Sequence, residues 1–189
     1  MQLRQEKEHF TYADYCTWED DGQRWELIDG EAYLMASPTF SHQRISRKLA
    51  RKFDEHLDGK KCEVFQDVDV RLSWNKDDDT IISPDLIITC DPDKFSDDKS
   101  HKGAPDLVIE IHSPSTKKYD ITTKFIKYRE AGVKELWFVD PSSQTVQVFK
   151  WEKGEYLAYG YGPTDKITVG TLPELTIDMN GIFDIETSQ

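Results

Sequence analysis

The stretch "PDLVIEIHSPSTKKYDITTKF", residues 105–125, decides the fold and carries the first candidate site residues. The apolar run within residues 104–113 is typical of a buried strand. This strand ends in a carboxylate, Glu110. His112 follows two residues later on the same face, because side chains in a strand alternate between its two faces. The sequence therefore places two ionisable side chains next to each other at the end of one strand.

The segment after this strand, residues 114–132, predicts a helix. Ser115 or Thr116 suits the position just before the first helical turn, and Gly132 suits the position just after the last one. The apolar residues 133–141 then predict a second strand. A helix between two strands allows a crossover, so the second strand can lie parallel to the first in one sheet.

Outside this unit the chain alternates between further helices and strands. Alternating apolar and polar residues predict strands, apolar residues at i and i+4 predict helices, and the pairs Asp29-Gly30 and Lys153-Gly154 predict hairpin turns. The expected elements are a short helix after Thr11, a hairpin in 24–35, a helix in 37–57, a strand in 62–74, a strand interrupted near Pro84 in 81–90, a polar loop in 91–103, a hairpin in 145–162 and short strands in 167–183. This order predicts an α/β (α+β) fold, a mixed β-sheet flanked by helices, in a single domain of residues 1–189.

The composition is that of a globular protein without a membrane span. Of the 189 residues, 37% are hydrophobic and 32% are charged, which argues against a disordered chain. No apolar run approaches the roughly 20 residues that a membrane-crossing helix needs, and the first ten residues lack the apolar core of a signal peptide. We therefore expect a cytoplasmic protein. We also expect Cys16, Cys62 and Cys90 to be buried free thiols, because they lie far apart without a CxxC pair.

The net charge of −12 argues against a protein that coats nucleic acid through bulk electrostatics. The charge is unevenly distributed along the chain, because residues 41–66 carry a balance of +3 and residues 99–134 a balance of +4. Both basic blocks are expected to contain helices. They indicate either a local basic surface on an acidic body or ordinary solvated helix faces.

Two carboxylates, Asp85 and Glu110, are the first candidates for a metal site. Asp85 lies on the strand that precedes that of Glu110, and neighbouring strands are about 4.8 Å apart. The two side chains can therefore reach one ion if the register matches, and carboxylate oxygens suit Mg²⁺ or Mn²⁺. Asp106 shares a face with Glu110 but stands about 13 Å away along the strand. We expect Asp106 to have no catalytic part.

Several motifs, in order along the chain, resemble the signature of one known family. They are "WELIDGEAYLMASPTFSHQRI", "SPDLIITC", "GAPDLVIEIHSPST", "YDITTKFIKY" and "AGVKELWFVDP", and together they span nearly the whole chain. By these motifs the sequence resembles the Uma-two family, described as "putative restriction endonucleases", within the PD-(D/E)XK nuclease superfamily. The resemblance implies a restriction-endonuclease-like core, a mixed sheet flanked by helices, here with an added N-terminal hairpin and C-terminal β-hairpin.

The superfamily pattern implies roles for individual residues. Pro84-Asp85 corresponds to its Pro-Asp element and Glu110 to its second carboxylate, whereas His112 occupies the place of its lysine. This departure leaves the strand without the usual cation. The resemblance implies that Lys124, on the following helix, replaces it. His112 is then expected to hydrogen-bond to a metal ligand or to bind the metal weakly.

The helical spacing agrees with this role for Lys124. Asp120, Lys124 and Tyr128 stand at i, i+4 and i+8 along one stripe, and a lysine there could reach over the end of the sheet. Without the resemblance, a surface lysine paired with Asp120 is the simpler interpretation. Glu26 matches an acidic position of the family and is either a third carboxylate of the metal site or a surface charge of the hairpin. His42 is expected to be a partly buried histidine with satisfied hydrogen bonds.

The sequence and the resemblance together predict a metal-dependent DNA endonuclease. Asp85, Glu110 and Lys124 are the predicted catalytic residues, and Glu26 and His112 are additional candidates. Asp85 and Glu110 are expected to hold Mg²⁺ or Mn²⁺, with DNA as the substrate, no membrane partner, and a homodimer implied by the resemblance. The alternative is a catalytically silent module that kept the nuclease fold and binds nucleic acid or protein. The acidic composition and the histidine in place of lysine favour that alternative.

Overall fold

The computed structural model describes residues 8–19, 22–73, 77–95, 100–113 and 120–183. The predicted cap residues Ser115 and Thr116 lie outside these ranges. The described helical segments are α1 (Tyr12–Tyr15), α2 (Phe40–Leu57), a 3₁₀ helix η1 (Pro92–Phe95), a π-helical turn η2 (Asp120–Lys124) and α4 (Phe125–Ala131). Within the described ranges, no helix has both the length and the apolar character that a membrane crossing requires.

The described strands form a six-stranded sheet, a five-stranded sheet and a two-stranded sheet. In spatial order, the six-stranded main sheet consists of β11 (Glu155–Tyr161), β10 (Thr145–Glu152), β9 (Glu135–Asp140), β8 (Leu107–Ile111), β6 (Leu86–Thr89) and β3 (Glu63–Gln66). The five-stranded N-terminal sheet consists of β2 (Glu31–Leu34), β1 (Trp25–Ile28), β5 (Ile81–Ile82), β4 (Val70–Arg71) and β7 (His101–Lys102). The two-stranded sheet consists of β12 (Lys166–Thr168) and β13 (Thr176–Asp178).

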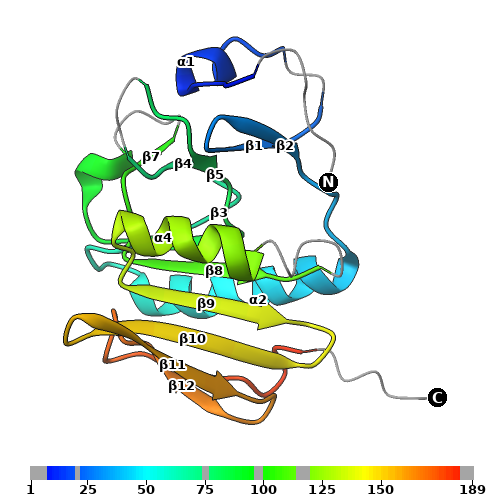
Figure 1. The fold of residues 1–189 in the computed structure, drawn as a ribbon. Coiled ribbons are helices and arrows are strands. Elements are labelled where there is room, and N and C mark those ends of the chain that lie inside the picture. Colours follow the sequence, from blue (N-terminus) through cyan, green and yellow to red (C-terminus); the bar gives the residue numbers. More distant parts are fainter. Residues whose placement is uncertain (1–7, 20–21, 74–76, 96–99, 114–119, 184–189) are drawn as a thin grey trace.

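The main sheet confirms the predicted mixed sheet flanked by helices. Strands β8 and β9 are parallel, as a crossover through η2 and α4 allows, and the other pairs in this sheet are antiparallel. Ile45, Leu49 and Phe53 of α2 pack on one face of the sheet, while Tyr128 of α4 packs with Val108 on the other. Figure 1 shows α4 and α2 on opposite sides of β8. The charged end of β8 therefore lies between two helices that can both contribute side chains.

Two predicted strands are in fact each divided between the two sheets. The expected strand in 62–74 becomes β3 in the main sheet and β4 in the N-terminal sheet. The chain turns between them at Asp67, which has a positive φ of 54°. The strand in 81–90, predicted to be interrupted near Pro84, likewise becomes β5 and β6. The interruption was correctly predicted, but alternation of apolar residues could not show that the chain changes sheets at that point.

The predicted hairpin turns are confirmed by their backbone conformation. Asp29 and Gly30 have φ values of 51° and 77°, and Lys153 and Gly154 have 51° and 94°, as two-residue turns between antiparallel strands require. Gly132 ends α4 in the left-handed conformation, with a φ of 84°, as predicted. The two hairpin turns set the registers of β1 against β2 and of β10 against β11.

The prediction of free, buried thiols is wrong for all three cysteines. Cys62 and Cys90 form a disulfide, and Cys16 is free but exposed. The pairing follows from the register of β3 and β6, because Glu63 lies opposite Thr89 and the next residues outward are the two cysteines. The two cysteines are separated by 28 residues in the chain, so local sequence patterns do not show that they are close in space.

The segment 91–103, predicted as a polar loop, contains η1 and the short strand β7. β7 buries His101, whose side chain is 2% exposed and donates from Nδ1 to the carbonyl oxygen of Gly103 at 3.0 Å. Burial lowers the pKa of His101 to about 4. The imidazole is therefore neutral in the folded protein near neutral pH, whereas the unfolded chain takes up a proton near its ordinary pKa of about 6.5.

This pKa predicts an acid-sensitive contribution to stability. The free energy of unfolding should fall as the pH drops from about 6.5 to about 4, because the unfolded state then binds more protons, and the loss attributable to His101 is about 3 kcal/mol. Urea unfolding of the wild type and a His101→Gln variant across this range should show a weaker pH dependence in the variant. His9→Gln, which alters an exposed histidine, is the control. Equal pH dependence in the wild type and His101→Gln would contradict the prediction.

Candidate functional site

The centre of the candidate site is the ammonium group of Lys124. This residue ends the π-helical turn η2 and precedes α4, and such turns are frequent at functional sites. Its Nζ donates to Oε1 of Glu26 at 2.7 Å and lies 3.3 Å from Oε1 of Glu110. The side chain is only 6% exposed. The interpretation of Lys124 as a surface lysine is therefore wrong.

Glu110 approaches this ammonium from the end of β8. The side chains of Val108 and Glu110 share the face of the main sheet that α4 covers. The hydroxyl group of Tyr128, one turn beyond Lys124, donates to the same Oε1 of Glu110 at 2.5 Å. The predicted stripe thus directs Lys124 and Tyr128 to one carboxylate. The side chain of Asp120, its third member, lies outside what the structure describes.

Glu26 reaches the same ammonium from β1 of the N-terminal sheet. Its side chain is 3% exposed, so the interpretation as a surface charge of the hairpin is wrong. The backbone N–H of Ser83 donates to Glu26 Oε1 at 3.0 Å. The hydroxyl group of Ser83 donates to Asp69 at 2.5 Å, and the hydroxyl group of Tyr15 donates to the other oxygen of Asp69 at 2.9 Å. Lys124 therefore joins the two sheets through one carboxylate from each.

The pairing of α4 with the hairpin turn supports this position of Glu26. Nζ of Lys127 donates to Asp29 Oδ1 at 2.6 Å, and this hydrogen bond to Asp29 raises the pKa of Lys127 above its ordinary value. Because Asp29 belongs to the turn that ends β1, this contact holds the strand next to α4. Lys127 points to the turn and not to the carboxylates, as expected for a residue in another sector of the helix.

Asp85 stands at the entrance of β6, next to β8. Leu86 pairs with Ile109, and continuing this antiparallel register by one residue places Asp85 opposite Glu110. The backbones of Asp85 and Glu110 are therefore neighbours, as the sequence analysis required. The carboxylate of Asp85, however, accepts the backbone N–H of Ile111 at Oδ2 at 2.6 Å. Its Oδ1 lies 3.0 Å from Nε2 of His42 on α2.

The pair of Asp85 and His42 is a charge-assisted contact. Burial by itself would lower the pKa of His42, but the hydrogen bond to Asp85, with the negative charges of Asp85 and Asp67, outweighs it, and the pKa of His42 is raised above its ordinary value. The imidazolium form is thus favoured next to the carboxylate. The hydrogen bond of Asp85 to the Ile111 N–H and its contact with His42 together fix this carboxylate beside the end of β8.

The structure brings the predicted residues into two adjoining groups. The Lys124 ammonium contacts both Glu26 and Glu110 on the α4 side of the main sheet, whereas Asp85 contacts His42 on the α2 side. The groups meet at the end of β8, because Asp85 binds the backbone N–H that directly follows Glu110. The two predicted metal ligands are therefore neighbours through the backbone, but their carboxylates have different partners.

The donor chemistry of the site fits a hard divalent cation. Glu26 and Glu110 already hold one positive charge, the Lys124 ammonium, and carboxylate oxygens are what Mg²⁺ and Mn²⁺ prefer. Within the ranges described here, no three acidic, histidine or cysteine side chains are arranged to hold a metal ion on their own. Mg²⁺ is usually bound by one or two carboxylates together with waters and substrate phosphates.

His112 and Asp106 occupy the remaining predicted positions. The ring of His112 stacks on that of Phe138, with 5.5 Å between centroids and 13° between planes, and the residue is 5% exposed. Asp106 stands at the opposite end of β8, where it accepts Nζ of Lys134 at 2.7 Å and the backbone N–H of Cys90 at 2.9 Å. Burial by itself would raise the pKa of Asp106, but the hydrogen bond from Lys134 outweighs this effect. The pKa of Asp106 is therefore lowered.

Two residues, His42 and Asp69, were not assigned to the site from the sequence. His42 was expected to be only a satisfied, partly buried histidine, yet it contacts a predicted metal ligand. Its position in the first turn of α2, on the side of the buried Ile45, was the available signal. Asp69 was not singled out because it looked like one polar residue of an alternating strand. The division of that strand between two sheets brings it to Ser83, and no local pattern indicates this.

Comparisons with known proteins agree with the sequence resemblance. A family model, Uma2, described as "Putative restriction endonuclease", matches residues 11–180. An uncharacterized protein of Synechocystis sp., slr1290, is 30% identical over 165 residues, which cover 84% of each chain. A second uncharacterized protein from the same organism, sll1609, is 28% identical over 121 residues, which cover 63% of this chain and 67% of its own.

A solved structure shares the fold. It is described as "a putative nuclease belonging to DUF820" from Anabaena variabilis, and it superposes with a TM-score of 0.74 over 92% of this chain and 97% of its own, at 19% sequence identity. This likeness supports the mixed α/β architecture and not a particular activity. Because the family model spans most of the residues, including all of the site, the chain belongs to the Uma2 (Uma-two) family.

Proposed function

We propose that this protein is a divalent-metal-dependent DNA endonuclease that hydrolyses phosphodiester bonds. The observation that carries the proposal is the buried ammonium of Lys124 between Glu26 and Glu110, beside a fixed Asp85. Buried charges are costly unless they are paired, so a lysine between two carboxylates at a sheet end is a candidate functional group. Membership of a family described as "Putative restriction endonuclease" supports the same reaction class.

Each residue has a separate part in this proposal. Glu110 and Asp85 supply the carboxylate oxygens for the cation, and Glu26 holds the Lys124 ammonium beside them. When bound, the divalent cation supplies electrostatic stabilisation of the negative charge that develops on the phosphate. Lys124 adds a fixed positive charge at the same place, and such preorganised charges act strongly where water is excluded.

Two further side chains hold the carboxylates in position. Tyr128 donates its hydroxyl hydrogen to Glu110, and His42 contacts Asp85. Groups that orient metal ligands commonly affect metal affinity as well as activity. In this proposal His112, stacked on Phe138, packs beside the site and does not take over the lysine's role.

The direct test is cleavage of supercoiled plasmid and of single-stranded DNA by the purified chain with Mg²⁺ and with Mn²⁺. We expect cleavage that requires the metal and stops when EDTA is added. DNA binding that is lost at moderate salt, without cleavage under any of these conditions, would instead favour the silent binding module. The predicted homodimer can be tested on the same preparation by sedimentation.

A separate prediction concerns the ion. The wild type should bind Mn²⁺ with a heat signal in titration calorimetry, and Asp85→Asn should lower that affinity about tenfold or more, because the amide keeps the shape but loses the charge of a hard ligand. Asp106→Asn is the matched control, since Asp106 lies at the far end of β8, and it should bind as the wild type does. An equal loss in both variants would show that Asp85 has no special place in the site.

A further inference from the structure

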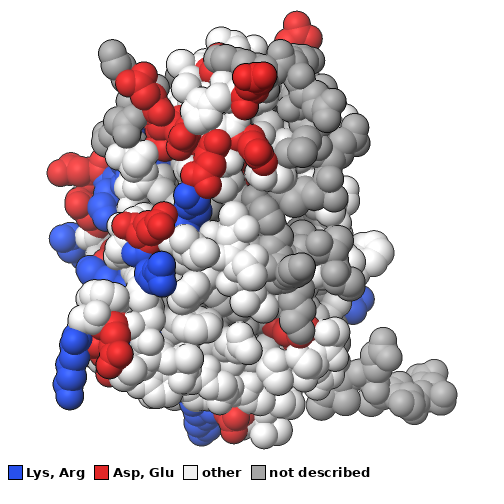
Figure 2. Space-filling model, in the orientation of Figure 1, with Lys and Arg blue, Asp and Glu red and all other residues white. Residues whose placement is uncertain are grey.

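The solvent side of α2 has a composition unlike that of the acidic chain around it. From Phe40 to Phe53 the sequence contains five basic residues and no acidic one, whereas the whole chain carries a net charge of −12. The basic residues are Arg44, Arg47, Lys48, Arg51 and Lys52. Figure 2 shows acidic side chains concentrated over the upper part of the molecule, where α1 and the N-terminal sheet lie. The basic part of α2 is therefore a local exception to the charge of the protein.

Three of these basic residues form a row with an exposed aromatic ring. Phe40, Arg44, Arg47 and Arg51 stand at i, i+4, i+7 and i+11, which places them along one side of a helix, and all four are exposed. The opposite stripe, which includes Leu49, is buried against the main sheet. The row extends over about 16 Å at 1.5 Å per residue. We call these four residues the α2 ridge.

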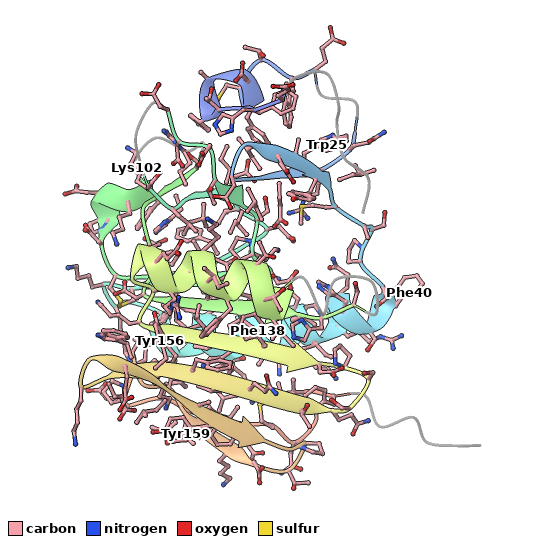
Figure 3. The ribbon with its side chains drawn as sticks, in the orientation of Figure 1. Trp25, Phe40, Lys102, Phe138, Tyr156 and Tyr159 are labelled. Atoms are coloured by element: carbon pink, nitrogen blue, oxygen red, sulfur yellow. A yellow bond between two sulfur atoms is a disulfide. The ribbon has the colours of Figure 1, made fainter. Side chains whose placement is uncertain are left out.

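Phe40 begins the ridge, and none of the residues that the structure describes buries its ring. Its side chain is 85% exposed, more than any other exposed large hydrophobic residue described in the structure, and Figure 3 shows it projecting from the end of α2. The helix start does not need this ring, because Thr39 caps the helix by accepting the backbone N–H of His42 at 3.2 Å. Single exposed hydrophobic residues are ordinary, but this one is aligned with three arginines.

The ridge begins beside the candidate site. His42, in the first turn of α2, contacts Asp85 through Nε2 at 3.0 Å, so Phe40 is two residues from a group that touches a proposed metal ligand. A strand that lies along the ridge would therefore pass, at its Phe40 end, the helical turn that carries His42. Guanidinium groups suit phosphates because they offer paired donors in a plane, and an aromatic face suits a nucleobase.

We propose that the α2 ridge binds a DNA strand with unpaired bases, with Arg44, Arg47 and Arg51 on successive phosphates and Phe40 stacked on a base next to the bond that is cleaved. The charge complementarity of the ridge to a polyanion selects nucleic acid, and the ring selects unpaired bases, since bases within a duplex already stack on each other. The inference rests on the proposed endonuclease function and names its substrate as single-stranded or locally unpaired DNA.

The first test measures the binding of a fluorescein-labelled single strand by anisotropy, with EDTA present so that no cleavage occurs. Phe40→Ala should weaken binding by about 5- to 100-fold, the usual range for the loss of one base–aromatic stack. Phe40→Trp should bind as tightly as the wild type. The fluorescence of a 2-aminopurine base in the strand should be quenched when the wild type or Phe40→Trp binds, but not when Phe40→Ala binds. Trp151→Ala, which removes an aromatic ring of 51% exposure on β10, is the matched control and should leave binding unchanged.

The second test uses the salt dependence of the same binding. Replacing Arg44, Arg47 and Arg51 by glutamine should weaken binding and reduce the slope of log K against log salt by about 2, because each phosphate contact on a single strand contributes about 0.7. A blunt duplex of the same sequence should bind more weakly and should be insensitive to Phe40→Ala. Unfolding by urea should be the same in the Phe40 and arginine variants as in the wild type, because each of these side chains is exposed.

The outcomes separate this inference from the proposed function. If the wild type cleaves DNA while Phe40→Ala and the triple arginine variant bind and cleave normally, the ridge inference is overturned and the endonuclease function stands. If single strands bind in a Phe40-dependent way but no metal supports cleavage, the ridge is supported and the endonuclease function fails. If the wild type binds no DNA at all, both are overturned.

Discussion

A Glu110→Gln variant is expected to cleave DNA about a thousandfold more slowly than the wild type, or not at all. Glutamine has the shape of glutamate, and its carbonyl oxygen can still accept hydrogen bonds from Lys124 and Tyr128, which contact Oε1 in the wild type. What it lacks is the negative charge that the cation requires. The expected loss is at the upper end of the effect of removing one preorganised charge from an active site. Initial rates with Mg²⁺ and Mn²⁺ on plasmid and on single-stranded DNA measure it.

The chain offers a matched control for this substitution in Glu135. It is also a buried glutamate, on the neighbouring strand β9, where its carboxylate accepts the Trp137 Nε1 hydrogen at 2.9 Å and the Thr171 backbone N–H at 2.8 Å. Glu135→Gln should lower the free energy of unfolding, because hydrogen bonds to a charged group are stronger than those to a neutral one, but should leave the cleavage rate per folded molecule unchanged. A Glu110→Gln variant that is as active as Glu135→Gln would remove Glu110 from the mechanism.

The strand that carries Glu110 was predictable because its signals are local. A short apolar run bounded by polar residues indicates a buried strand, and the helical spacing between Lys124 and Tyr128 indicates a shared side of a helix. Both were predicted from the sequence, and both contact Glu110 in the structure. The parallel pairing of β8 with β9 is likewise one that the helix between them allows. Local periodicity was therefore sufficient to predict the central strands and the helix between them.

The neighbours of these residues were less predictable because they depend on tertiary contacts. The burial of Lys124 could not be read from its helix, since a lysine between polar residues looks exposed, whereas in the structure Glu26 approaches it from the other sheet. The same is true of the Cys62–Cys90 disulfide and of the contact between His42 and Asp85. Each joins segments whose distance in the chain says nothing about their distance in space.

Asp85 shows how a correct pairing can still leave the site incomplete. The register of β6 and β8 places it opposite Glu110, as the proximity argument required. Its carboxylate nevertheless binds the Ile111 N–H and His42, because the chain enters β6 from another sheet and the alternation of side chains does not hold at Pro84. A strand pattern predicts which residues are neighbours, but not which hydrogen-bond donors their side chains contact.

A Lys124→Met variant is expected to be both slower and less stable than the wild type. Cleavage should fall by about a hundredfold or more, because one preorganised positive charge is lost from the site. The free energy of unfolding should fall by about 3–5 kcal/mol, because Glu26 and Glu110, whose side chains are 3% and 5% exposed, would keep buried charges without their partner. A surface lysine would not have this second effect, which follows from the burial of Lys124. Initial cleavage rates and urea unfolding curves measure the two effects.

A double substitution separates the two effects of Lys124. In Glu26→Gln/Lys124→Met, one unpaired carboxylate is also neutralised, so part of the lost stability should return while cleavage stays low. Lys127→Met is the control on the same helix, because Lys127 pairs with Asp29 at the hairpin turn and contacts neither site carboxylate in the structure. It should cleave nearly as the wild type does. If the double variant regains activity together with stability, Lys124 serves only to neutralise buried carboxylates, and another positive charge must act on the phosphate.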